Sequence, residues 1–202
     1  MTKLEISLLG NFSISAPGGS GVDLQRKYKL VLAALALVGA DGMSRERLIE
    51  LLWPGQDEEK GRANLRQALT ACRKYLGSYR ACLESAGDTL TLDPDSTVVD
   101  TNEFIRLADA ATADGYNSAI AIYRGSLLDG LPLKEENFET WVQPMREKFH
   151  QRAVDVLQNA LENQAKGQRS IDLAQRLLKI EPTCEAGHLS LMETYAAQGR
   201  YD

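Results

Sequence analysis

The sequence predicts an α+β part over residues 1–95, followed by an all-α part over residues 96–202. Three observations predict this division. Short segments that alternate apolar and polar side chains stand at both ends of the first part and enclose a block of helical segments. The turn-forming sequence Asp93-Pro94-Asp95-Ser96 comes next and has the composition of a linker. Beyond it, apolar residues recur at helical spacing and no strand is evident.

The first segment predicts a small antiparallel sheet over Leu4–Leu24. Leu4, Ile6 and Leu8 share one face of an extended chain, and Phe12 and Ile14 repeat the alternation after Gly10-Asn11. A turn cluster at residues 17–21 then leads to a short third strand at residues 22–24.

Three helices follow the sheet. The segment Lys27–Val38 is apolar almost all round, which indicates burial on several sides, and Gly39 and Gly42 end it. Ser44 is suited to cap a helix over Arg45–Trp53, which Pro54-Gly55 stops. The third helix begins at Asp57-Glu58-Glu59, whose acids suit the positive end of a helix dipole, and runs to Leu76 before Gly77.

A β-hairpin is predicted after the third helix. Arg80–Glu84 and Thr89–Leu92 have the composition of strands, and Ser85-Ala-Gly-Asp88 between them is a turn. The predicted order of the first part is therefore sheet, three helices and hairpin.

The second part is predicted to consist of paired helices. The expected segments are Thr101–Thr112, Tyr116–Arg124, Phe138–Lys166, Ile171–Ile180 and Cys184–Gln198. Pro144 is expected to divide or kink the third of them. Leu127–Leu133 reads as a loop with apolar anchors, and the regular glycine breaks at Gly167 and Gly199 indicate stacked helical hairpins.

Bulk composition excludes several classes of protein. The longest apolar run, Leu30–Val38, is about half of the roughly 20 residues that cross a bilayer, so no membrane association is expected. The N-terminus lacks the features of a secretory signal. The three cysteines, Cys72, Cys82 and Cys184, are an odd number without a CxxC pair, which argues against a disulfide framework and favours a cytoplasmic location.

Charge is distributed unevenly along the chain. The net charge is −5, but the cations and acids of residues 1–95 balance, so the whole deficit belongs to residues 96–202. Within the balanced half, residues 60–74 carry five cations and no acid. These are Lys60, Arg62, Arg66, Arg73 and Lys74. Local charge matters more than the total when a protein meets phosphate, so nucleic acid remains a candidate partner.

The basic helix has two distinct faces on a helical wheel. Its apolar stripe consists of Leu65, Ala68, Leu69, Cys72 and Leu76. The opposite face consists of Ala63, Gln67, Thr70 and Lys74, flanked by Lys60, Asn64 and Arg66. Amides can pair with adenine, Arg with guanine, and Thr or Ala can touch a thymine methyl, so this mixture suits a major groove. Arg62 lies closer to the apolar stripe and is better placed for a phosphate than for a base.

Context strengthens this interpretation, because a helix pair before the basic helix and a hairpin after it are the order of a winged helix-turn-helix. The fold class predicted for residues 1–95 is therefore an α+β winged helix-turn-helix with a preceding antiparallel sheet.

Several segments resemble one bacterial family. Leu48-Ile-Glu-Leu-Leu-Trp-Pro-Gly55, Arg62-Ala-Asn-Leu-Arg-Gln-Ala-Leu69 and Arg73-Lys-Tyr-Leu-Gly77 resemble the OmpR-like winged helix of the bacterial antibiotic-regulatory-protein family of transcriptional activators. Leu8-Leu-Gly-Asn-Phe-Ser-Ile14 is similar to that family's first strands. The second half is similar to its bacterial transcriptional activator domain, with tetratricopeptide-like helices. Matching positions there are Asp100, Phe104, Ala119, Tyr123, Gly125, Leu128, Gly130, Trp141 and Arg146.

The resemblance implies sequence-specific binding of double-stranded DNA, with the third helix in the major groove and the wing near a minor groove. It implies groove contacts from Arg62, Asn64, Arg66, Gln67, Thr70 and Lys74. Further phosphate contacts are candidates for Arg26, Lys27, Arg45, Arg47 and Arg73. The turn Ser85–Asp88 departs from the pattern because it carries no cation, so a strong minor-groove contact by the wing is not expected.

The helical part is expected to serve regulation. Stacked helix pairs form surfaces for other protein segments, so RNA polymerase, another protein partner or a second copy in a homodimer are candidates. Gly199–Asp202 matches the turn inside a tetratricopeptide-type repeat, so we expect a chain truncated within a repeat. The competing interpretation is a protein–protein interaction or signalling module whose winged helix no longer binds DNA, which the acidic second half favours.

No catalytic site, metal site or cofactor is expected. The two histidines, His150 and His188, lie on separate predicted helices and belong to no HExxH sequence. The glycine-rich phosphate loops GxxxxGK[ST] and GxGxxG are absent from the sequence. The acid pair Glu135-Glu136 reads as ordinary exposed charge.

Overall fold

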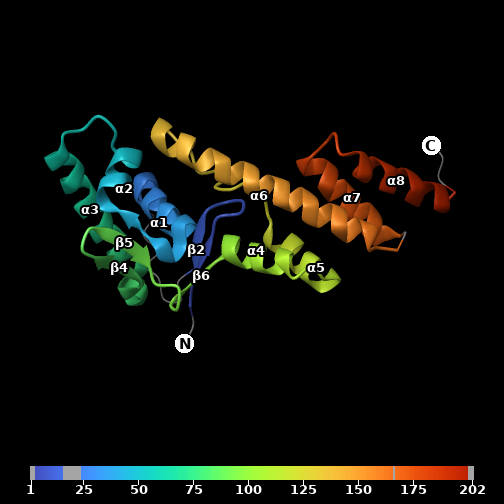
Figure 1. The fold of residues 1–202 in the computed structure, drawn as a ribbon, viewed down its shortest axis with the longest axis horizontal. Coiled ribbons are helices and arrows are strands. Elements are labelled where there is room, and N and C mark those ends of the chain that lie inside the picture. The colour runs from blue at the N-terminus through green and yellow to red at the C-terminus, as the bar shows by residue number, and fades with distance from the viewer. Residues whose placement is uncertain (1–2, 16–23, 166, 200–202) are drawn as a thin grey trace. The chain divides into compact units, whose positions relative to one another are not determined.

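The computed structural model describes residues 3–15, 24–165 and 167–199 (Figure 1). The chain forms two compact units, each built from two stretches of sequence. The first unit comprises Met1–Asn102 and Leu127–Met145, and the second comprises Glu103–Ser126 and Arg146–Asp202. The fold class is confirmed at the level of small sheets near the N-terminus and a helical C-terminal part. These compact units are discontinuous in sequence and divide the chain at other positions than residue 95. The predicted domain boundary after residue 95 stays a prediction.

The sheet near the N-terminus differs from the predicted one. Strand β1 (Leu4–Ser7) pairs antiparallel with β2 (Ser13–Ser15), as expected, but its other neighbour is β6 (Thr97–Val99), which runs parallel to β1. The expectation of no strand beyond the linker is therefore wrong. Three residues are too few to display an alternating pattern, and the partner lies far away in the sequence. The predicted third strand falls mainly on residues 22 and 23, outside the described residues, and Leu24 is buried without being in a strand.

The three helices of the first unit agree with the prediction. They are α1 (Arg26–Val38), α2 (Arg45–Leu52) and α3 (Glu58–Leu76). The Ser44 hydroxyl accepts a hydrogen bond from the Arg47 amide at 3.1 Å, and the Asp57 carboxylate accepts one from the Lys60 amide at 2.8 Å. Both are N-caps that satisfy amides left without a partner in the first helical turn.

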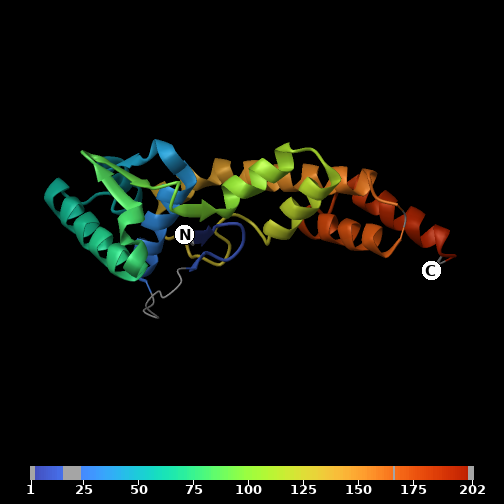
Figure 2. The same ribbon diagram turned by 90° about the horizontal axis from the view of Figure 1, so that it is seen from below.

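The hairpin is shorter than predicted and belongs to a three-stranded sheet. Strand β5 (Thr89–Leu92) lies between β3 (Met43–Ser44) and β4 (Leu83–Ala86). The residues before β4, which were predicted to start its strand, form the 3-10 helix η2 (Gly77–Cys82). A second 3-10 turn, η1 (Gly39–Asp41), connects α1 to β3. Figure 2 shows the hairpin beside α3, in the same part of the first unit.

The loop at residues 127–133 returns the chain to the first unit. Leu127 and Leu128 are its buried apolar anchors, and the Leu128 amide donates to the Leu8 carbonyl at 2.8 Å. Asp100, at the start of α4 (Asp100–Asp109), accepts hydrogen bonds from the amides of Leu8 at 2.7 Å and Leu9 at 3.0 Å. Residues after position 95 thus complete the strand layer of the first unit.

The described part of the second unit is helical. Besides most of α4, it contains α5 (Ala113–Ile122), most of α6 (Glu136–Glu162), α7 (Gln168–Ile180) and α8 (Glu185–Ala197). Helix α6 continues through Pro144, so the expected division of this helix does not occur. Helices α7 and α8 pack side by side, as the predicted helical hairpin requires, with the Ser170 and Ser190 hydroxyls 2.9 Å apart (Figure 1). No helix among the described residues has the length and hydropathy to cross a bilayer.

Candidate nucleic-acid interface

Helix α3 buries the face that its periodicity predicts. Leu65, Ala68, Leu69, Cys72 and Leu76 are all buried, together with Gly61 near the N-terminal end. Gly61 faces α2 so closely that a Cβ atom at its position would lie 2.6 Å from Cγ2 of Ile49. The apolar stripe therefore holds the helix on the core and determines which side chains face outward.

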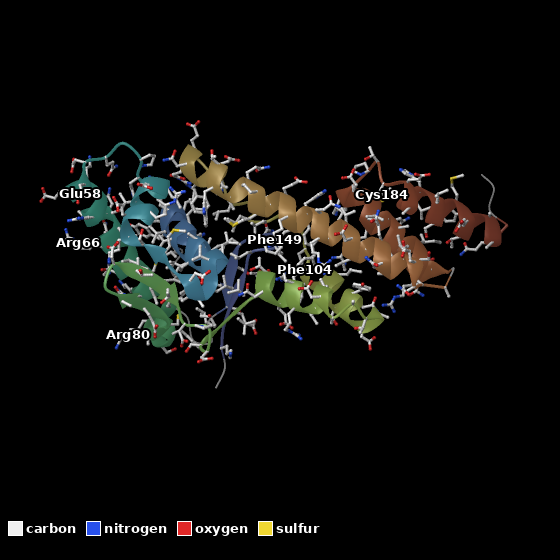
Figure 3. The ribbon with its side chains drawn as sticks, viewed as in Figure 1. Glu58, Arg66, Arg80, Phe104, Phe149 and Cys184 are labelled. Carbon is white, nitrogen blue, oxygen red and sulfur yellow. The ribbon has the colours of Figure 1, made fainter. Side chains whose placement is uncertain are left out.

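The outward face of α3 carries the polar and basic side chains expected there. Ala63, Arg66, Gln67, Thr70 and Lys74 are all exposed. Figure 3 shows Arg66 projecting away from the helix. The Thr70 hydroxyl donates to the Arg66 carbonyl at 2.9 Å, so its methyl group and its oxygen lone pairs remain for a partner.

Several cations of this helix have no acidic partner. Among the described residues, Lys60, Arg66 and Lys74 form no ion pair. Arg62 is paired with Glu58 on the same helix, and both side chains are more than two-thirds exposed. Such exposed pairs contribute about 0–1 kcal/mol, so a phosphate could replace Glu58 as the partner of Arg62 at little cost.

Asn64 is held by the connection between α2 and α3 and does not project freely. It is half-buried, and its Nδ2 donates to Oε1 of Gln56 at 2.6 Å. Together with Gln67 it lines a pocket of about 420 Å³, whose other walls include Lys27 and Trp53. Asn64 therefore lies at the margin of the outward face.

Arg73 and Arg45 point toward the hairpin. Arg73 is half-buried, and its Nη2 donates to the Leu83 carbonyl at 3.2 Å. Arg45 Nη2 donates to the Ser85 hydroxyl at 2.6 Å, which ties the start of α2 to the hairpin. Arg47 pairs with Glu50 on the exposed side of α2 at 3.0 Å.

Arg26 and Lys27, two candidate phosphate contacts, are engaged by Glu135. Arg26 Nη1 and Nη2 lie 2.5 Å and 2.6 Å from the two carboxylate oxygens, and Lys27 Nζ lies 3.4 Å from Oε1. The interpretation of Glu135 as exposed charge is wrong, because only 7% of the residue is exposed. The hydrogen bond from Arg26 to Glu135 raises the pKa of Arg26. Local sequence could not reveal this pairing, because the partners lie more than 100 residues apart.

Arg80 is a cation that the sequence analysis did not select. It was assigned to a strand of the hairpin, but it lies in η2, just beyond the C-terminal end of α3, where it is exposed (Figure 3). It forms no ion pair among the described residues. It is the next cation after Lys74, and no acid stands between them in the sequence, which is the signal that could have identified it.

The cysteines have a structural role. Cys72 and Cys82 in the first unit and Cys184 in the second are free and buried. Burial raises the pKa of Cys72 to about 12 and that of Cys82 to about 11. A thiol with such a pKa is poorly suited to act as a nucleophile or as a metal ligand. The described residues contain no cluster of three His, Cys, Asp or Glu side chains that could hold a metal ion.

The chain is similar to known proteins in two respects. Residues 99–202 match the family model described as the bacterial transcriptional activator domain. The whole fold is similar to a solved structure of Mycobacterium tuberculosis EmbR in complex with a low-affinity phosphopeptide, with a TM-score of 0.67 and 20% sequence identity. That similarity covers 98% of this chain and 56% of the EmbR chain, so this chain spans little more than half of that protein. No curated protein matches the sequence of this chain.

Proposed function

Because the chain belongs to the family of the bacterial transcriptional activator domain, we propose that it is a transcriptional activator that binds double-stranded DNA through α3. The observation that carries this proposal is the outward face of α3. There, three cations that have no acidic partner in the part of the chain that the structure describes accompany an amide and a hydroxyl, opposite a fully buried apolar stripe.

In this proposal the first unit is a winged helix-turn-helix. Helices α2 and α3 are the helix pair, and the β4–β5 hairpin is the wing. The hairpin turn carries no cation, so the wing adds little electrostatic affinity. Most contacts then come from α3 and from the residues at its ends.

The side chains divide into base-reading and phosphate-binding groups. Arg66, Gln67 and Thr70 are placed to meet base edges, because they are exposed on the middle of the outward face. Lys74 and Arg62, with Lys60 and Arg80, are suited to phosphates. Asn64, Arg73, Arg45 and Arg47 are proposed at the margins, where Arg73 and Arg45 also hold the hairpin against the helices.

The helical part is proposed to contact RNA polymerase or another protein, and a homodimer is a further candidate. These partners follow from the family and from the suitability of paired helices for binding protein segments. A cytoplasmic location follows from the same role, and no catalytic activity is proposed.

Duplex binding by alanine variants tests the proposal. Fluorescence anisotropy with a duplex enriched from a random pool by the wild-type chain measures affinity over a range of salt concentrations. We expect Arg66→Ala and Gln67→Ala each to weaken binding by about 1–3 kcal/mol, because each side chain would leave a base edge unpaired. Lys74→Ala should make the slope of the logarithm of the binding constant against the logarithm of the salt concentration shallower by about 0.9.

Matched controls are available on exposed helical positions away from α3. Arg169→Ala on α7 and Gln143→Ala on α6 remove the same side-chain types and should bind like the wild type. Unchanged affinity in both α3 variants would exclude α3 as the reader. A wild-type chain that binds no duplex at low salt would exclude DNA binding and favour the protein-interaction module.

A further inference from the structure

The first unit contains a segment from the part of the chain that matches the activator-domain family. Leu127–Met145 lies within the matched range 99–202, yet it packs with the helices of the proposed DNA-binding unit. Two polar side chains from this segment, Glu135 and Asn137, make side-chain hydrogen bonds with α1 and α2.

Glu135 supplies the acid that α1 lacks. The first turn of α1 holds no acidic residue and instead begins with Arg26 and Lys27. Two cations at the positive end of a helix dipole are unfavourable. The buried Glu135 carboxylate lies against both cations and offsets this repulsion, so the conformation of Lys27 depends on Glu135.

Lys27 in turn caps the C-terminal end of α2. Its Nζ donates to the carbonyl of Leu52, the last residue of α2, at 2.8 Å, and lies 5.5 Å from the centre of the Trp53 ring. The last four carbonyls of a helix have no partner within it, so this contact satisfies a group that would otherwise stay unpaired. A cation at this end also complements the helix dipole.

Asn137 satisfies a second carbonyl at the same end. Its Nδ2 donates to the carbonyl of Glu50 at 2.9 Å. The end of α2 is thus capped by Asn137 directly and by Glu135 through Lys27.

The capped end leads directly into α3. The connection from Trp53 to Asp57 joins the two helices, and Gln56 within it is hydrogen-bonded to Asn64 of α3. A change at the end of α2 would therefore alter the angle at which α3 leaves it.

We propose that Glu135 and Asn137 are positioning residues for DNA reading, which hold α3 at its reading angle by capping α2 from the activator-domain segment. This inference rests on the proposed function. Side chains recognise bases through hydrogen bonds, which require short distances. A small rotation of α3 therefore lowers the preference for one DNA sequence over others. Phosphate contacts tolerate such a rotation, because charges act over longer distances.

The test compares Glu135→Gln/Asn137→Ala with a matched control, Glu136→Gln/Thr140→Ala. Both control positions are exposed on α6, which holds Asn137 and begins directly after Glu135, and they have no described side-chain partner. Anisotropy with the enriched duplex and with a random duplex gives the ratio of the two affinities. We expect this ratio to fall about tenfold in the test variant, with little change for the random duplex, and to stay at the wild-type value in the control.

Hydrogen exchange gives a second readout that needs no DNA. The amides of Trp53, Gln56 and Gly61 make local hydrogen bonds at the end of α2, in the connection and at the start of α3. They should exchange faster in the test variant and at the wild-type rate in the control. If the double variant fails to fold, Asn137→Ala alone provides both readouts, because it removes one hydrogen bond at an exposed side chain.

Four results would overturn the inference. An unchanged affinity ratio and unchanged exchange would show that the caps do not position α3. Tighter binding to both duplexes with a steeper salt dependence would show that Glu135 merely screens Arg26 and Lys27 from phosphate. Loss of preference in Arg66→Ala with full preference in the test variant would leave the proposed function standing without this inference, whereas a wild-type chain that binds no duplex would overturn both.

Discussion

Glu135 shows how a single side chain links distant parts of the first unit. Its carboxylate is buried, yet it faces both Arg26 and Lys27, so its ionised form is stabilised by two positive charges. Burial raises the pKa of Glu135, but the hydrogen bond and charge of Arg26 and the charge of Lys27 outweigh it and hold the pKa below the usual value. The ionised group therefore favours the folded state.

Stability should depend on pH through Glu135 in the acid range. A carboxyl whose pKa is lower in the folded state contributes stability above its unfolded pKa, about 4.3, and loses that contribution as pH falls through the lowered value. Urea unfolding measures the free energy of unfolding between pH 7 and pH 3. We expect the value for Glu135→Gln to be about 2 kcal/mol or more below that of the wild type at pH 7, and the difference to shrink toward pH 3.

The adjacent acid is the control for this measurement. Glu136→Gln removes the same charge from an exposed position and should stay within about 1 kcal/mol of the wild-type curve, because Glu136 acts only through the dipole of α6. A constant difference between Glu135→Gln and the wild type at every pH would show that the ionised carboxylate contributes nothing.

At the scale of elements, the proposed interface depends on how closely α2 and α3 approach. Gly61 lies in the second turn of α3 and is buried against the β-branched side chain of Ile49. Glycine is a poor helix former, so its presence inside a long helix requires a packing reason. The missing Cβ allows the approach of the two helices and so helps to determine where the outward face of α3 lies.

Gly61→Ala should lower stability even though alanine favours helix. Alanine adds about 1 kcal/mol of helix propensity, but its Cβ would lie 2.6 Å from Cγ2 of Ile49, and the stiff β-branched side chain cannot move away freely. We expect a net loss of about 1–3 kcal/mol in urea unfolding, together with weaker duplex binding. Ala63→Gly, on the exposed face of the same helix, measures the difference in helix propensity between alanine and glycine without a change in packing. A stabilised Gly61→Ala variant would mean that the helices separate without cost.

At the scale of the whole molecule, the first unit is discontinuous in sequence. Strand β6 completes its first sheet by pairing with β1. The amide of Leu8, directly after β1, donates to the Asp100 carboxylate. Asn137, from the segment Leu127–Met145, caps the C-terminal end of α2. The unit that we propose to bind DNA is thus completed by residues that match the activator-domain family. If the first unit binds DNA as proposed, residues of the matched segment can affect that binding through these contacts.

A fragment of residues 1–95 should therefore be much less stable than the full chain. It lacks the parallel partner of β1 and the Asp100 carboxylate, whose hydrogen bonds to two amides are worth at least about 3 kcal/mol together. Thermal unfolding followed by circular dichroism should show a lower and broader transition for the fragment. A fragment of residues 1–145, which keeps every segment of the first unit, should recover most of the loss. Equal stability of the short fragment and the full chain would show that residues 1–95 fold independently.

The candidate site was predictable where it depends on helix periodicity. The stripe from Leu65 to Leu76 determines which face of α3 is buried, so Arg66, Gln67, Thr70 and Lys74 were found on the outward face from spacing alone. The environments of Asn64 and Arg73 were not predictable, because their partners, Gln56 and Leu83, lie in connections whose path depends on tertiary packing.

The helices of the first unit and the faces they bury were predictable from local sequence, because they depend on residues within one or two turns of each other. Ser44, Asp57 and Gly77 mark helix ends for reasons contained in a few neighbouring residues. Long-range packing determines three other features, which are the parallel pairing of β1 with β6, the return of Leu127–Met145 and the burial of Glu135. Those features join segments about 90 or more residues apart, whose pairing depends on the packing of the whole unit and leaves no periodic signal in either segment.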